Sequence, residues 1–111
     1  MRTKLSDLEI QRALGGLPGW SRKGSALVKT YSFARFADGI RFVQQVAEIA
    51  DKIDHHPDID IRYTKVTFSL STHDAGGITQ RDLDLATAIE QAAFKPANTN
   101  PSPGGSGKPG K

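Results

Sequence analysis

The chain has 111 residues, of which 37% are apolar and 24% charged, so it can form one small domain with a single thin core. It contains no cysteine, which excludes disulfide scaffolds, thiol catalysis and thiolate metal sites. No apolar run is long enough to cross a bilayer, and the N-terminus leads into no signal-peptide core, so we expect a cytoplasmic protein.

The basic charge of the chain comes from its C-terminal end. The formal net charge is +3, from 15 basic and 12 acidic residues, but Lys95, Lys108 and Lys111 all lie beyond Phe94. The first 94 residues are therefore neutral overall and contain no basic run or RNA-binding aromatic motif. A nucleic-acid-binding domain usually carries a basic face on its folded part. We expect binding to neither nucleic acid nor membranes.

The composition changes abruptly after Phe94. Residues 95–111 hold four prolines, four glycines and no large apolar side chain. Such a segment cannot offset its conformational entropy by burial. The sequence therefore predicts one domain over residues 1–94 and a disordered tail over residues 95–111.

Capping motifs and periodicity predict the first half of the domain. Ser6 and Glu9 match a capping box at the start of a helix over residues 7–14, which a glycine pair ends. A strand hairpin over residues 20–33 follows, turning near position 24. Apolar residues at three- and four-residue spacings then predict an amphipathic helix over residues 36–53.

The second half reads as two strands and a helix. Apolar side chains occupy odd positions from 59 to 63 and even positions from 66 to 70, so a tight turn or bulge must lie near Thr64 and Lys65. Thr79 and Asp82 match a second capping box, and an apolar face follows to residue 93. The predicted order is a helix followed by ββαββα. It favours an α+β two-layer sandwich, with a four-stranded antiparallel sheet covered by helices on one face.

Three histidines lie where elements meet loops, at His55, His56 and His73. If the helix continues past residue 53, Asp51 lies on the same face as His55, four residues earlier. Its carboxylate would then favour the imidazolium and fix the tautomer. The alternative is an imidazolium that interacts only with the helix dipole.

The other two histidines have equally plain alternatives. His56 precedes Pro57 and should be extended, so it either points into a site or forms a solvated corner. The parity of the last strand directs His73 away from the helix-packed face. On that open face, an exposed histidine without function is the ordinary alternative. Adjacent histidines suit shared zinc coordination poorly, so we expect no metal.

Two further features have ordinary structural explanations at this stage. Asp82 is accounted for by its place in the capping box and by the helix dipole. Gly76 and Gly77 precede a helix and could accept an anion, but two glycines alone are a weak signal.

The segment from residue 51 to residue 82 reads D-x3-H-H-P-x5-Y-x9-H-x8-D. The motif is formed by Asp51, His55, His56, Pro57, Tyr63, His73 and Asp82. This spacing resembles the signature of the pterin-4a-carbinolamine dehydratase family, the 4a-hydroxytetrahydrobiopterin dehydratases also known as the dimerization cofactor of a homeodomain transcription factor. An early Gly-Trp pair, an S-L-S-T-H run and an R-D-x-x-L-A run extend the resemblance over residues 5–94.

The resemblance implies a ββαββα fold and an activity. Family members dehydrate 4a-hydroxytetrahydropterin to quinonoid dihydropterin and water without a metal or organic cofactor, and they form homo-dimers or tetramers. The active-site histidines carry over to positions 55, 56 and 73. Asp51 corresponds to the acid that supports the first histidine, and Trp20 and Pro57 correspond to residues that line the cleft. Asp82 completes the motif as a supporting residue.

A division of roles follows as a hypothesis. His55 and His73 are candidate acids for the leaving hydroxyl, and His56 orients the ring or accepts the proton from N5. The alternative function is non-enzymatic, because relatives also act as a transcription-factor partner or as assembly factors. A pure binding module needs no complete histidine set, so we favour the enzyme.

Overall fold

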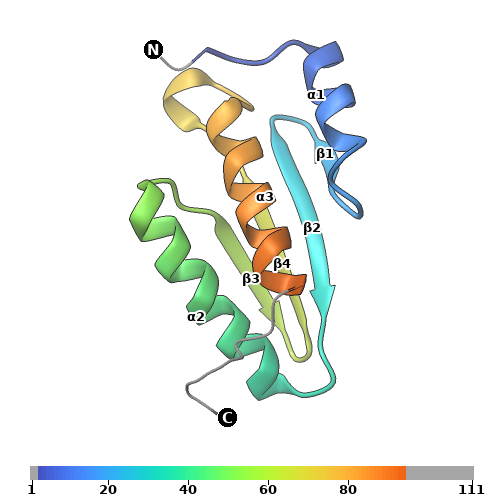
Figure 1. Ribbon diagram of the computed structural model, residues 1–111, viewed down its shortest axis with the longest axis vertical. Coiled ribbons are helices and arrows are strands. Elements are labelled where there is room, and N and C mark those ends of the chain that lie inside the picture. Colours follow the sequence, from blue (N-terminus) through green and yellow to red (C-terminus); the bar gives the residue numbers. More distant parts are fainter. Residues whose placement is uncertain (1–2, 95–111) are drawn as a thin grey trace.

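The computed structural model describes residues 3–94, so the predicted tail over residues 95–111 lies outside the described part of the chain. Its elements, shown in Figure 1, are α1 (Asp7–Leu14), β1 (Ser21–Lys23), β2 (Ala26–Ser32), α2 (Phe36–Ile53), β3 (Asp58–Arg62), β4 (Lys65–Leu70), the 3-10 helix η1 (His73–Ala75) and α3 (Gln80–Phe94). None of the helices in residues 3–94 is long and apolar enough to cross a membrane.

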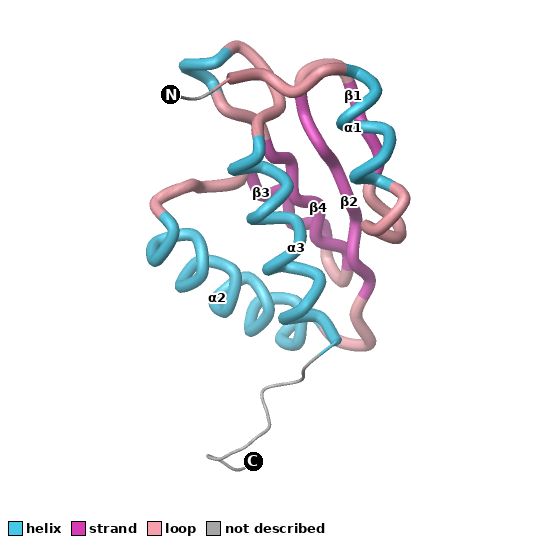
Figure 2. Tube along the Cα trace, turned by 45° about the horizontal axis from the view of Figure 1, so that its top comes forward, coloured by secondary structure: helices cyan, strands magenta, loops and turns pink. Residues whose placement is uncertain are grey.

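The strands form one antiparallel sheet in the order β1-β2-β4-β3. Helices α2 and α3 lie side by side over one face of this sheet, as Figures 1 and 2 both show. The predicted α+β two-layer sandwich is therefore confirmed. The central position of β4, between β2 and β3, places the end of that strand and the loop after it among the ends of its neighbours.

The core lies between the sheet and the two long helices. Val66, Phe68 and Leu70 alternate along β4 and are fully buried. Val46 of α2 and Ile89 of α3 are equally inaccessible from the opposite layer. The intervening residues of β4 face the other side of the sheet, which no long helix covers, because side chains alternate along a strand.

Local signals set the ends of the helices. Ser6 and Glu9 form both bonds of the predicted capping box at α1. Helix α2 ends at Ile53 because Asp54 adopts a left-handed conformation, with φ of 54°. The chain then turns sharply, and His55 leaves the helical register.

The apolar residues change from odd to even positions between the last two strands because a tight hairpin turn lies there. Tyr63 adopts φ of 55° in this turn, directly after β3. Ile59 and Ile61 pair with Phe68 and Val66, so the apolar residues of both strands share one face. The sequence-based prediction of two strands is therefore confirmed.

Candidate active site

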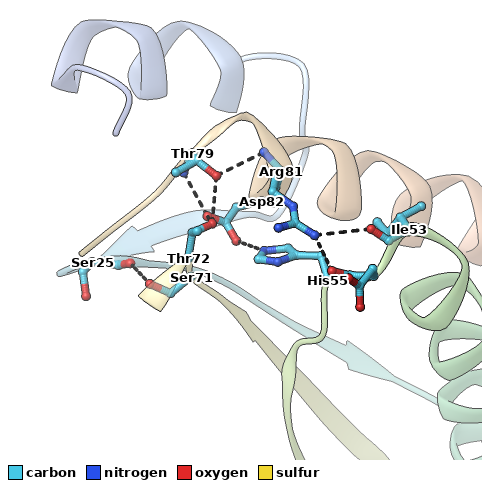
Figure 3. Close-up of polar contacts among 9 residues, drawn as sticks. Ser25, Ile53, His55, Ser71, Thr72, Thr79, Arg81 and Asp82 are labelled. Carbon is cyan, nitrogen blue, oxygen red and sulfur yellow. Dashed lines mark hydrogen bonds and ion pairs between the residues drawn. The ribbon is translucent and has the colours of Figure 1, made fainter. Parts of the chain in front are cut away.

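His55 forms a buried pair with Asp82. The Nε2 atom of His55 lies 2.6 Å from Oδ1 of Asp82, and these side chains are only 10% and 0% exposed. The pair joins the loop after α2 to the first turn of α3, as Figure 3 shows. A hydrogen bond between two elements that are 27 residues apart holds the imidazole in one orientation.

Three donors hold the carboxylate of Asp82. Its Oδ2 atom accepts hydrogen bonds from Oγ1 of Thr72 and from the backbone N–H of Thr79, both at 2.9 Å. The two threonine hydroxyls also lie 2.8 Å apart. Because an ionised carboxylate only accepts hydrogen bonds, Nε2 of His55 carries the proton in this pair. Nδ1 is then the ring nitrogen left for proton exchange.

Asp51 pairs with His56 rather than His55. Oδ1 of Asp51 lies 2.9 Å from Nε2 of His56, and these side chains are 79% and 58% exposed. The expected support of His55 by Asp51 required another turn of α2. The left-handed residue Asp54 ends the helix first, so the i, i+4 alignment of Asp51 with His55 never forms.

His73 lies at the start of η1 and is exposed. It lines a pocket of about 350 Å³ together with Ser69 and Ser71, which alternate with the buried residues of β4. Asp58, at the start of β3, also lines this pocket and pairs with Ser69 in the sheet. His73 therefore lies on the side of the sheet that the parity of β4 predicts.

The three histidines gather at one end of the sheet. Thr72, which bonds the carboxylate that holds His55, directly precedes His73 in the chain. His56 comes two residues before Asp58, a wall of the His73 pocket. His55 itself lines a smaller pocket of about 130 Å³ with Arg81. His55 and His73 thus line two different pockets that share no residue, and His56 lines neither of them.

The chain as a whole has counterparts among known proteins. The family model described as "Pterin 4 alpha carbinolamine dehydratase" matches residues 3–92. The chain belongs to this family of hydro-lyases.

Individual relatives agree with the family assignment. A protein of Roseiflexus sp. (strain RS-1), whose name assigns it provisionally to pterin-4-alpha-carbinolamine dehydratase, is 55% identical over 82% of this chain and 98% of its own. A provisionally named dehydratase of Mycobacteroides abscessus is also 55% identical, over 78% of this chain and 92% of its own. The crystal structure of a transcriptional coactivator/pterin dehydratase from Brucella melitensis is 31% identical and has a TM-score of 0.78. That match covers 80% of this chain and 97% of the other.

Two aromatic residues that the family resemblance singles out lie apart from the histidines. Trp20 is 5% exposed and donates a hydrogen bond from Nε1 to Glu90, at 3.3 Å. Glu90 follows Asp82 by eight residues of α3, a rise of about 12 Å along the helix. Tyr63 is 75% exposed and lies past the far end of β3, about 17 Å from its start. The half-buried Pro57, by contrast, directly follows His56.

Glu90 is the acceptor of a second buried polar cluster in this family member. Its Oε2 atom accepts hydrogen bonds from Nζ of Lys29 at 2.6 Å, from the hydroxyl of Tyr31 and from Nε1 of Trp20. Burial alone would raise the pKa of Glu90, but the hydrogen bonds from Lys29 and Tyr31 outweigh it, so the net shift is downward. The carboxylate is therefore held in its ionised form.

The substitution Glu90→Gln should destabilise the fold by about 1–2 kcal/mol at neutral pH, because it removes charge-assisted hydrogen bonds. A lowered folded-state pKa gives stability that is present above the ordinary value of 4.5 and is lost as pH falls through the folded value. Urea unfolding of both proteins at about pH 7 and about pH 3 should therefore show the difference in free energy of unfolding shrinking in acid. An equal difference at both pH values would contradict this.

Sequence reasoning missed two residues that support the histidines. Thr72 holds Asp82, and Arg81 donates from Nη2 to the backbone carbonyls of Ile53 and Asp54, which fixes the turn that carries His55. Thr72 lies in the S-L-S-T-H run and Arg81 begins the R-D-x-x-L-A run of the family resemblance, but neither run indicated these supporting roles. Within residues 3–94, no three histidine, aspartate or glutamate side chains are grouped so as to hold a metal ion.

Proposed function

We propose that this protein dehydrates 4a-hydroxytetrahydropterin to quinonoid dihydropterin and water, as part of tetrahydrobiopterin recycling. The observation that carries the proposal is the buried, oriented His55–Asp82 pair, linked through Thr72 to the exposed His73. Family membership supports the same reaction. A residue that only caps α3 would not need to bond His55. The hydrogen bond between Asp82 and His55 is therefore the feature that capping does not explain.

The reaction needs two proton transfers and no redox step. The C4a–O bond breaks as the oxygen gains a proton and leaves as water. N5 loses its proton, and its electron pair forms the C4a=N5 double bond. An imidazole can both donate and accept protons near neutral pH, so histidines suit both transfers. The protons balance, and no metal or organic cofactor is needed.

The geometry supports distinct roles for the three histidines. His73 lines the larger open pocket and is a candidate acid for the 4a oxygen. His55 is the second candidate acid, exchanging its proton at Nδ1 because Asp82 occupies Nε2. His56 orients the pterin or accepts the proton from N5, with Asp51 as its partner. Asp82 acts through His55 and is a positioning residue.

We also propose that the protein works as a homo-dimer or tetramer. Strand β3 is at the edge of the sheet, and all five of its residues are exposed. Ile59 and Ile61 are 37% and 40% exposed on this strand, so a partner that covered the edge would bury apolar surface. Analytical ultracentrifugation that found only monomer at micromolar concentrations would argue against this assembly.

A dehydratase assay tests the proposed function directly. The purified chain, mixed with chemically prepared 4a-hydroxytetrahydropterin, should accelerate the appearance of quinonoid dihydropterin absorbance over buffer. A folded double variant, His55→Ala with His73→Ala, is the matched control and should return the rate close to that of buffer.

A non-enzymatic role as a binding partner is the second candidate, because the related Brucella melitensis protein carries the name of a coactivator as well as a dehydratase. Folded protein that gives no acceleration over buffer would favour this role. Acceleration that the double variant abolishes would favour the enzyme.

A further inference from the structure

A second pocket adjoins the one that His73 lines. It has a volume of about 440 Å³, and both pockets have Ser25 and Gly76 in their walls. Its remaining wall includes two basic side chains, Lys4 and Arg22. Neither the family motif nor the proposed proton transfers uses this pocket.

The wall between the two pockets is fixed by backbone hydrogen bonds. The N–H of Thr72 donates to the carbonyl of Gly77 at 2.9 Å, and the N–H of Gly77 donates back to Thr72 at 3.3 Å. Ser71 Oγ also donates to the carbonyl of Ser25 at 2.7 Å, as Figure 3 shows. At Gly76, a Cβ atom would meet no heavy atom within 4 Å. The space beside this glycine is therefore open.

The wall of the second pocket holds an excess of one basic side chain, Lys4 and Arg22 against Asp7. Nη1 of Arg22 lies 2.6 Å from Oδ1 of Asp7, so these two charges neutralise each other. The hydrogen bond and charge of Arg22, and to a smaller extent the charge of Lys4, lower the pKa of Asp7, which keeps its carboxylate ionised. The Lys4 stem lies close to Gly77, and its ammonium has no ion-pair partner within residues 3–94. Lys4 is thus available to an anion.

We propose that the second pocket receives the C6 substituent of the pterin and favours substrates whose substituent carries an anionic group, as a phosphate ester or a carboxylate. This inference rests on the proposed function. C6 is bonded to N5, so its substituent leaves the ring beside the reacting C4a–N5 bond. With the ring at His73 and its C6 edge turned to Gly76, the substituent enters the adjoining pocket and extends toward Lys4.

The test compares two 4a-hydroxytetrahydropterins that differ only in a hydroxyl or a phosphate ester at the end of the C6 substituent. We expect kcat/KM to be about tenfold higher for the phosphate ester at low salt, with the preference shrinking as salt screens the contact. Lys4→Ala should raise KM for the phosphate ester about tenfold, leave kcat unchanged and leave the neutral substrate unaffected. Lys23→Ala, an exposed lysine of β1 outside the pocket wall, is the matched control and should change neither.

The outcomes separate this inference from the proposed function. If both substrates are dehydrated equally well, or if the preference survives Lys4→Ala, the inference is overturned while the enzyme stands. If neither is dehydrated, the proposed function fails. Equilibrium binding of the corresponding unreactive dihydropterins then decides the inference, and equal affinities for the phosphate and the alcohol would overturn it. A third substrate with a carboxylate at the same place shows which anion is preferred.

Discussion

Replacing Asp82 with asparagine is expected to lower kcat for dehydration about 100-fold, because the amide cannot accept hydrogen bonds at both of its terminal atoms. The wild-type carboxylate accepts from His55 at one oxygen and from Thr72 and Thr79 at the other. In the variant, an NH2 group must face either the imidazole or the threonines. If it faces His55, Nε2 must accept a hydrogen bond, so the ring turns to its other tautomer, with the proton on Nδ1, and cannot form the imidazolium that serves as the acid.

Steady-state kinetics and nitrogen NMR of the imidazole together test this role. A positioning residue predicts a fall in kcat with little change in KM, together with a changed His55 tautomer in the NMR spectrum. Asp60→Asn, an exposed carboxylate of β3, is the matched control and should leave both unchanged. A wild-type rate in Asp82→Asn with a normal fold would show that Asp82 only caps α3.

The alanine variant measures how much Asp82 contributes to the stability of the fold. Asp82→Ala should destabilise the fold by about 2–4 kcal/mol, because it leaves buried donors of His55, Thr72 and Thr79 without an acceptor. Denaturant unfolding measures this loss. The asparagine variant should lose less stability than the alanine variant, since its carbonyl still accepts one hydrogen bond.

The elements of the fold could be predicted because their signals are local. The capping box at Ser6 and Glu9 acts over three residues, and the periodicity of the helix over residues 36–53 needs no information from elsewhere in the chain. The parity change near Thr64 is also a local signal, and it required either a tight turn or a bulge. The predicted hairpin over residues 20–33 is one residue too long at each end, since Trp20 lies just before β1 and Phe33 just after β2.

The pairings within the site could not be predicted in the same way. Whether Asp51 meets His55 depends on one residue, Asp54, and aspartate tolerates the left-handed conformation without requiring it. The capping box accounted for one oxygen of Asp82, and the family motif did not indicate that the other oxygen would contact His55. That oxygen meets His55 only after two distant segments have packed, and spacing along the chain does not encode such contacts.

His73→Ala is expected to lower kcat for dehydration about 100-fold while leaving the free energy of unfolding nearly unchanged. His73 is exposed at the start of η1, so its ring supports little packing. His55→Ala should cause a similar loss of rate but also destabilise the fold by about 1–3 kcal/mol, since it leaves Oδ1 of Asp82 buried without a donor. The two variants should therefore lose a similar amount of kcat, but only His55→Ala should also lose stability. The motif alone does not predict this difference.

Single-turnover kinetics and denaturant unfolding on the same preparations distinguish these expectations. Tyr63→Phe is the control, because Tyr63 belongs to the same motif but lies past the far end of β3, and its rate should stay at the wild-type value. If His73→Ala dehydrated the pterin at the wild-type rate while His55→Ala were inactive, the proton would come from the His55 side alone. The substrate would then have to occupy the smaller pocket beside Arg81 rather than the one between β3 and η1.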